Sequence, residues 1–176
     1  MNNPQTSVLI SDAHIQDRVR ELGRMVTKDF PDGELIVVGI LKGAFMFVAD
    51  LTRAIERPLK LDFMGISSYG RGKTSSGEVK VTKDLDMQIE GANVLIVEDI
   101  VDTGVTLSYL VGVLNQRKPR AIRIAALLDK PERRLRPVHV AYCGFQIPDE
   151  FVVGYGLDFD EDYRGLKDIC ILKEGA

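Results

Sequence analysis

The stretch NVLIVEDIVDTGVTL at residues 93–107 decides the fold and carries the chemistry of this chain. Its apolar first half predicts a buried strand, which runs into two adjacent carboxylates, Glu98 and Asp99. A third carboxylate, Asp102, opens a small turn at 103–106, where a helix should begin. Acids at the carboxyl end of a strand, followed by such a turn at a helix N-terminus, indicate a site for a phosphorylated sugar.

The turn has the features that suit a dianionic phosphate. It supplies backbone N–H groups, two hydroxyls and a glycine that permits a positive φ, and the helix dipole favours negative charge there. An acidic loop with an ordinary helix cap is the alternative interpretation. The residues of this turn are Thr103, Gly104, Val105 and Thr106.

The three carboxylates suggest different roles. Glu98 and Asp99 point to opposite sides if the strand continues, so they do not form a simple bidentate clamp. Near the strand end, both still reach a sugar diol or a divalent cation. Asp102 lies at the turn, where a carboxylate accepts a proton.

Composition gives no support for several classes of partner. The chain has 176 residues, 45% of them hydrophobic, which suits one domain with a buried core. A net charge of −3 gives no global reason to bind nucleic acid or an anionic membrane. No apolar stretch approaches the roughly 20 residues that span a bilayer. The polar N-terminus and the two isolated cysteines, Cys143 and Cys170, are typical of a cytoplasmic protein.

Charge is uneven along the chain. Residues 117–136 hold eight basic residues against two acids, and residues 149–162 hold six acids with no Lys or Arg. These segments are either two solvated surfaces, or a phosphate-handling side that faces an acidic metal side, or a charge-matched subunit contact.

Strands alternate with helices in the middle of the chain. This order predicts right-handed βαβ units, an α/β fold and a parallel sheet with helices on both faces. A Gly- and Ser-rich stretch at 69–77 looks like an active-site lid. We expect helices over 11–30, 44–55 and 106–116, strands over 35–41, 59–67, 93–97, 121–128, 138–143, 151–153 and 169–172, and a hairpin arm over 78–83.

Five segments together resemble one enzyme family. The central stretch is similar to the phosphoribosyl-pyrophosphate signature of type I phosphoribosyltransferases. Four others narrow the resemblance to the hypoxanthine (hypoxanthine-guanine) branch, especially its short bacterial members. They are LKGA at 41–44, SSYG at 67–70, LLDK at 127–130 and IPDEFVVGYGLDFDEDYRGL at 147–166. The resemblance runs from about residue 8 to residue 172.

The resemblance implies a fold and a reaction. The fold is a single domain with a core at about 8–145, a flexible lid at about 68–82, and a small hood formed by the N-terminal segment and about 146–176. Hypoxanthine or guanine displaces pyrophosphate from C1 of 5-phosphoribosyl 1-pyrophosphate, giving IMP or GMP through an oxocarbenium-like transition state. Mg²⁺ neutralises the departing pyrophosphate. Relatives form homodimers and homotetramers.

Roles follow for the acids and the phosphate loops. Glu98 and Asp99 match the pair that holds the ribose hydroxyls directly or through Mg²⁺, and Asp158 matches a ligand of a second Mg²⁺. Asp102 matches the carboxylate near purine N7 that is proposed as general acid/base. Residues 102–106 match the 5′-phosphate loop, in which Val105 replaces the Lys or Arg of some relatives and would lower the affinity for phosphate.

The remaining roles concern the pyrophosphate, the lid and the purine base. The donor to the 6-oxo group should reject adenine by orders of magnitude, because adenine offers a donor at that position. The matches are Lys42 and Gly43 for the pyrophosphate loop, whose peptide is often non-prolyl cis, Ser68 and Tyr69 for the lid, Lys130 for the 6-oxo donor, Phe151 for the stacking ring, Val152 for a backbone contact to the base, and Arg164 for pyrophosphate.

Two alternatives stay open beside this interpretation. One is a phosphoribosyltransferase that prefers xanthine. The other is a regulator of the same fold that binds a nucleotide or RNA without catalysis. The basic stretch at 117–136 is the only feature that favours the regulator, whereas every catalytic position is filled.

Overall fold

The computed structural model describes residues 6–68 and 79–173, and its centre is a six-stranded sheet. Five strands are parallel and only the edge strand β4 runs antiparallel, so the predicted, mainly parallel sheet is confirmed. The strands, in spatial order, are β4 (Val79–Lys83), β3 (Lys60–Ser68), β2 (Leu35–Leu41), β5 (Asn93–Val101), β6 (Ala121–Asp129) and β7 (Tyr142–Gln146).

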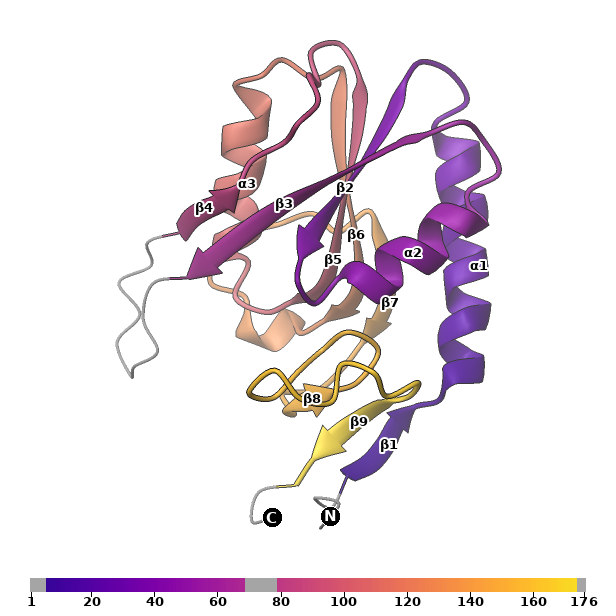
Figure 1. Ribbon diagram of the computed structural model, residues 1–176, viewed down its shortest axis with the longest axis vertical. Helices are drawn as coiled ribbons and strands as arrows, with labels where there is room; N and C mark the ends of the chain where they lie inside the picture. Colours follow the sequence, from indigo (N-terminus) through magenta and orange to yellow (C-terminus); the bar gives the residue numbers. More distant parts are fainter. Residues whose placement is uncertain (1–5, 69–78, 174–176) are drawn as a thin grey trace.

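Helices cover both faces of this sheet, as the alternation of strands and helices predicts (Figure 1). Helices α1 (Asp12–Asp29) and α2 (Phe45–Ala54) pack on one face, and α3 (Val105–Asn115) packs on the other. Leu95 belongs to the first apolar cluster and Ile96 to the second, because successive side chains of a strand point to opposite faces. Among the described residues no helix has the length and apolar character needed to cross a membrane.

A second, three-stranded sheet lies beside the carboxyl ends of the central strands (Figure 1). It joins β1 (Thr6–Ile10), β9 (Ile169–Leu172) and β8 (Val152–Val153) in that order, with antiparallel pairing throughout. Strand β1 was not predicted from the sequence, because its partner β9 lies at the other end of the chain and leaves no local signal. The two ends of the described chain therefore lie side by side.

Two strands of the central sheet differ from prediction by more than one residue. β5 continues to Val101, so Glu98 and Asp99 lie inside the strand and not after it. β7 begins at Tyr142, and the segment predicted as a strand from residue 138 has no ladder partner before that point. Val138 and Val140 instead pack against the apolar cluster under α3, which explains their apolar alternation.

Candidate functional site

Two adjoining cavities open at the carboxyl ends of the central strands, where ligands bind in open α/β sheets. The first cavity has a volume of about 580 Å³ and the second about 910 Å³. Asp99 and Asp158 line both, so these two carboxylates form the shared wall. Of the predicted site residues, the first cavity is also lined by Lys42, Gly43, Glu98 and Arg164, and the second by Asp102, Lys130, Phe151 and Val152.

The carboxylates of β5 are the electrostatic centre of the first cavity. Burial raises the pKa of Glu98 well above its ordinary value, and the neighbouring Asp99 carboxylate raises it further. Burial likewise raises the pKa of Asp99 to about 6, although the N–H of Ile100 donates a hydrogen bond to Asp99 Oδ1 at 2.7 Å. Glu98 Oε2 is buried without a hydrogen-bond partner among the described residues. The pair therefore favours a ligand that brings positive charge.

The loop between β2 and α2 lies against this pair. Its Leu41–Lys42 peptide is cis, as the family resemblance implied. A Cβ added to Gly43 would lie 1.6 Å from Asp99 Oδ2, so a larger residue there would displace the loop or the Asp99 carboxylate. On the other side, a Cβ on Gly156, which has φ +102°, would lie 2.1 Å from the Gly43 carbonyl oxygen. The loop is thus held between the end of β5 and the C-terminal segment.

Two cations of the first cavity, Lys42 and Arg164, are paired with acids of the C-terminal segment. Lys42 Nζ lies 3.1 Å from both carboxylate oxygens of Glu161. Arg164 Nη2 lies 2.9 Å from Asp158 Oδ1 and 3.1 Å from Glu161 Oε2. Its Nη1 donates to the Gly156 carbonyl at 2.8 Å. Glu161 therefore joins both cations, a role that no sequence motif indicated.

The donors of the first cavity fit a divalent cation that also binds a ligand. Within residues 6–68 and 79–173, no three His, Cys, Asp or Glu side chains converge into a complete metal cage. Mg²⁺ commonly uses one or two carboxylates together with substrate phosphates and water. The unpartnered oxygen of Glu98 and the two shared carboxylates of the cavity wall meet that requirement.

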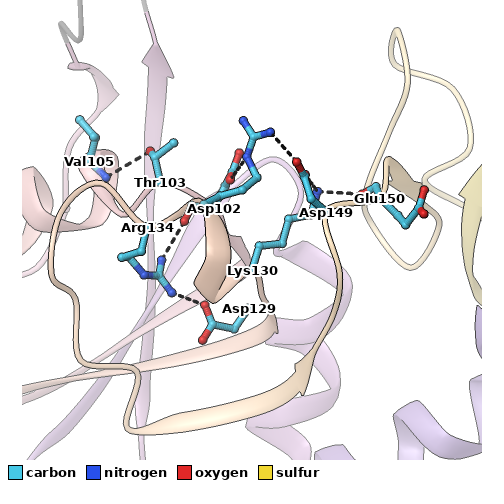
Figure 2. A network of polar contacts seen from close by, with 9 residues as sticks. Asp102, Thr103, Val105, Asp129, Lys130, Arg134, Asp149 and Glu150 are labelled. Carbon is cyan, nitrogen blue, oxygen red and sulfur yellow. Dashed lines mark hydrogen bonds and ion pairs between the residues drawn. The ribbon is translucent and has the colours of Figure 1, made fainter.

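A chain of charged side chains lines the second cavity (Figure 2). Lys130 is buried, and its Nζ donates to the Glu150 carbonyl at 2.7 Å and to Asp149 Oδ1 at 3.3 Å. Arg133 Nη1 donates to Asp149 Oδ2 at 3.0 Å, and its Nε donates to Asp102 Oδ1 at 2.6 Å. The predicted proton-handling and base-reading residues, Asp102 and Lys130, are therefore joined through Asp149 and Arg133, to which the sequence assigned no role.

The apolar side of the second cavity comes from the C-terminal segment. Phe151 is 53% exposed, and its ring meets Phe159 edge to face at 5.7 Å between centroids. Val152 is buried in β8. The Phe151 carbonyl accepts a hydrogen bond from Leu172 N at 3.0 Å, so β9 holds this wall in place. An exposed ring beside an open cavity is available to a flat ligand.

The predicted phosphate loop lies between the end of β5 and the start of α3. Gly104 has φ +78°, which explains the need for glycine. The Thr103 carbonyl accepts from Leu135 N and Arg136 N at 2.9 and 3.0 Å, and its hydroxyl accepts from Val105 N at 3.4 Å. Asp102 lines the second cavity, whereas residues 103–106 are outside the lining of the two cavities as described.

The predicted lid residues are only partly described. Ser68 ends β3 and pairs with Val79 of β4, and its neighbour Ser67 lines the first cavity. Tyr69 lies outside the described residues. The lid prediction therefore rests on the sequence alone.

Comparisons with known proteins come from a family profile, curated sequences and solved structures. The profile described as "Phosphoribosyl transferase domain" matches residues 10–160. The hypoxanthine-guanine phosphoribosyltransferase of Bacillus subtilis is 49% identical over 173 residues, which cover 98% of this chain and 96% of that protein. A crystal structure of a hypoxanthine phosphoribosyltransferase from Staphylococcus aureus matches with TM-score 0.92 and 48% identity, over 98% of this chain and 93% of that one.

Some relatives are much longer than this chain. The "Bifunctional protein TilS/HprT" of Listeria innocua is 50% identical over 173 residues, which cover 98% of this chain and 27% of that protein. The chain thus spans about a quarter of the length of these bifunctional relatives, and nearly the whole length of the single-activity ones.

Proposed function

The chain belongs to the phosphoribosyl transferase family, and from this premise we propose that it is a purine salvage enzyme. Its substrates are 5-phosphoribosyl 1-pyrophosphate and hypoxanthine or guanine, and its products are pyrophosphate and IMP or GMP. The names of the B. subtilis and S. aureus relatives support this choice. The observation that carries the proposal is the pair of cavities that meet at Asp99 and Asp158. Two substrates need two adjoining pockets with the reacting carbon between them.

The first cavity suits the pyrophosphate and the sugar. Lys42 and Arg164 bring positive charge, and the glycine at position 43 leaves bare backbone beside the carboxylates. Mg²⁺, when bound, would neutralise negative charge on the leaving pyrophosphate. Glu98, Asp99 and Asp158 are the residues that would hold it together with the ribose hydroxyls. Residues 102–106, at the N-terminus of α3, would bind the 5′-phosphate.

The second cavity suits the purine. Phe151 offers an exposed ring for stacking, and the backbone of Val152 follows directly at the base edge. Lys130 Nζ is fixed by its hydrogen bond to the Glu150 carbonyl. From this position it would donate a hydrogen bond to the 6-oxo group of the base. Asp102 lies in the same cavity and is available to take or return the proton of a purine nitrogen as the bond to C1 forms.

The structural divisions of the family complete the proposal. We assign residues 8–145 to the core, 68–82 to a lid, and the N-terminal segment with 146–176 to a hood, all within one domain. The three-stranded sheet supports the hood, because it joins the two ends of the described chain and its residues Ile171 and Leu172 line the second cavity. A cytoplasmic location and assembly into a homodimer or homotetramer belong to the same proposal, as does the absence of nucleic acid and membrane among the partners.

Pyrophosphate release with five bases, measured with and without Mg²⁺, tests the function. We expect turnover with hypoxanthine and guanine, much less with xanthine, adenine or uracil, and dependence on the metal. A preference for xanthine would favour the first alternative. Nucleotide binding without turnover on any base would favour the regulator and overturn the proposal.

Lys130→Ala tests the part of the proposal that concerns the purine. Loss of the ammonium should narrow the preference for hypoxanthine over adenine by about tenfold or more, because the unpaired donor no longer penalises adenine. The measurement is the ratio of kcat/KM for the two bases. An unchanged ratio would show that Lys130 does not read the 6-position.

A further inference from the structure

The proton-handling and base-reading residues of the second cavity are connected through one arginine and one aspartate. Arg133 ends the short 3₁₀ helix η1 (Pro131–Arg133), which follows the end of β6. Asp102 follows the end of β5, and Asp149 follows the end of β7. Three neighbouring strands therefore each contribute one member at their carboxyl ends.

The geometry of Arg133 is that of a bridge. Its Nε donates to Asp102 Oδ1 at 2.6 Å, while its Nη1 donates to Asp149 Oδ2 at 3.0 Å. The other oxygen of Asp149 lies 3.3 Å from Lys130 Nζ. Only a planar guanidinium presents two donors in fixed directions to two separate carboxylates. The result is a continuous path from Lys130 through Asp149 and Arg133 to Asp102.

The bridge contributes little to the stability of the fold. The side chains of Arg133, Asp102 and Asp149 are 45%, 42% and 48% exposed, and ion pairs with such exposure contribute little to folding. Lys130, whose side chain is only 11% exposed, anchors the other end in the wall of the cavity. The arrangement fixes directions in an open cavity and does not fill a core. Its effect should therefore appear in turnover before it appears in melting temperature.

Resting on the proposed function, we propose that Arg133 is a positioning residue that aims the Asp102 carboxylate at the purine and couples it, through Asp149, to Lys130. Arg133 holds Oδ1 of Asp102, which leaves Oδ2 of that carboxylate for the base nitrogen. When the 6-substituent of a bound purine accepts a hydrogen bond from Lys130, Asp149 shifts, and Arg133 carries this shift to Asp102. Recognition of the base and proton handling are thereby linked.

Neighbouring charges support the assignment without carrying it. Hydrogen bonds to Asp149 and then to Asp102 raise the pKa of Arg133 above its ordinary value, so the guanidinium stays charged. The adjacent Arg134 makes different contacts, since it donates to the Asp102 carbonyl at 3.0 Å and pairs with the buried Asp129 (Figure 2). Arg134 thus holds the backbone of the turn, while Arg133 holds the side chain.

Kinetics of Arg133→Gln, Asp149→Asn and the double variant, with melting temperatures for each, test the proposal. For Arg133→Gln we expect kcat with hypoxanthine to fall about tenfold, because the carboxylate is no longer aimed, while KM for 5-phosphoribosyl 1-pyrophosphate changes less than about twofold. Asp149→Asn should lower kcat and also raise KM for the base. In kcat the double variant should resemble Arg133→Gln alone, because both changes break one path. Melting temperatures should stay near that of the wild type.

Two further variants make the test sharper. Arg133→Lys keeps the charge but cannot span both carboxylates, so its kcat should stay below that of the wild type. Arg117→Gln, which removes an equal charge from an arginine paired with Asp84 near the end of α3, is the matched control and should leave kcat unchanged.

The outcomes separate this inference from the function on which it rests. An Arg133→Gln enzyme with wild-type kcat, a fully active Arg133→Lys enzyme, or losses in kcat that simply multiply in the double variant would each overturn the positioning role. Wild-type protein without turnover on any base would instead overturn the proposed function.

Discussion

The two cavities share a wall, yet burial and pairing shift the pKa values of their carboxylates in opposite directions, as the β5 pair and Asp149 show. In the first cavity, burial raises the pKa of Glu98 and Asp99. In the second, the hydrogen bond from Arg133 lowers the pKa of Asp149. The causes differ: Arg133 and Lys130 donate hydrogen bonds to Asp149, whereas Glu98 and Asp99 are buried and Glu98 Oε2 has no partner among the described residues.

This difference shows that the two cavities compensate the charge of their carboxylates in different ways. The second cavity has its compensating charges built into the chain and is organised before any ligand arrives. The buried pair Glu98 and Asp99 in the first cavity favours full ionisation only when further positive charge comes close. A divalent metal ion bound beside these carboxylates would supply that charge.

Asp102→Asn should impair turnover more than any other substitution in the second cavity. We expect kcat to fall by about 10²–10⁴, because the amide cannot accept a proton, while binding of 5-phosphoribosyl 1-pyrophosphate changes little. Steady-state turnover and equilibrium binding of that substrate measure the two effects separately. Unchanged turnover would remove Asp102 from the acid–base role.

Gly43→Ala should impair substrate binding in the first cavity, because the added methyl group crowds the Asp99 carboxylate. The new methyl group would fall 1.6 Å from Asp99 Oδ2, so either the loop or the carboxylate must move. We expect kcat/KM for 5-phosphoribosyl 1-pyrophosphate to fall about 100-fold. Gly112→Ala in α3 is the matched control, because a Cβ there meets nothing within 4 Å. Equal kcat/KM for the two variants would contradict the close approach of Gly43 to Asp99.

Melting temperature as a function of pH should distinguish the two sets of acids. The pKa of Asp99 is raised to about 6 in the folded protein. The stabilising contribution of Asp99 is therefore fully present at a pH below its ordinary pKa of about 4, and it is lost as the pH rises through about 6. Without metal, the melting temperature of the wild type relative to Asp99→Asn should therefore increase by roughly 3–6 °C from pH 8 to pH 4. A difference that is independent of pH would contradict the raised pKa.

Asp149 should show the opposite sign in the same experiment. Its pKa is lowered in the folded protein, so its stabilising contribution is present above its ordinary value and is lost as pH falls through the lower, folded value. The difference in melting temperature between wild type and Asp149→Asn should shrink only in strong acid. It should be small at every pH because the ion pair between Arg133 and Asp149 is exposed.

Glu161→Gln is expected to have the smallest effect and to refine the comparison. Glu161 pairs with two cations of the first cavity, Lys42 and Arg164. Removing its charge should lower KM for 5-phosphoribosyl 1-pyrophosphate by about two- to threefold, since the Lys42 contact is largely exposed. Glu21→Gln, which breaks an exposed pair with Arg18 in α1, is the control. A higher KM for the Glu161 variant would show that Glu161 supports binding and does not compete with it.

The central sheet could be predicted from the sequence because its signals are local. The apolar run before Glu98, the helical spacing from Ile15 to Val26, and the turn at Gly104 each depend on a few neighbouring residues. The pairing of β1 with β9 depends on residues at opposite ends of the chain, so no local pattern indicated it. The predicted start of β7 at Val138 was too early, because packing of Val138 and Val140 under α3 produces the same alternation as a strand.

The candidate site divides in the same way. Glu98, Asp99, Asp102 and Lys130 lie at or near strand ends within short motifs, and the structure brings them to two adjoining cavities. Asp149, Arg133 and Glu161 were assigned no role from the sequence. Their partners come from other strand ends or from a distant segment, and a sequence of mixed charges does not specify which pairs will form.

The three-stranded sheet also sets the order in which the protein becomes complete during translation. The wall that contains Phe151 and Val152 is held by β9, which in turn pairs with β1 from the start of the chain. A nascent chain can assemble the central sheet as soon as β7 has left the ribosome, but the second cavity cannot close until residues 169–172 emerge. Strand β1 thus stays without its ladder partner until β9 has emerged, and the wall of the second cavity is complete only then.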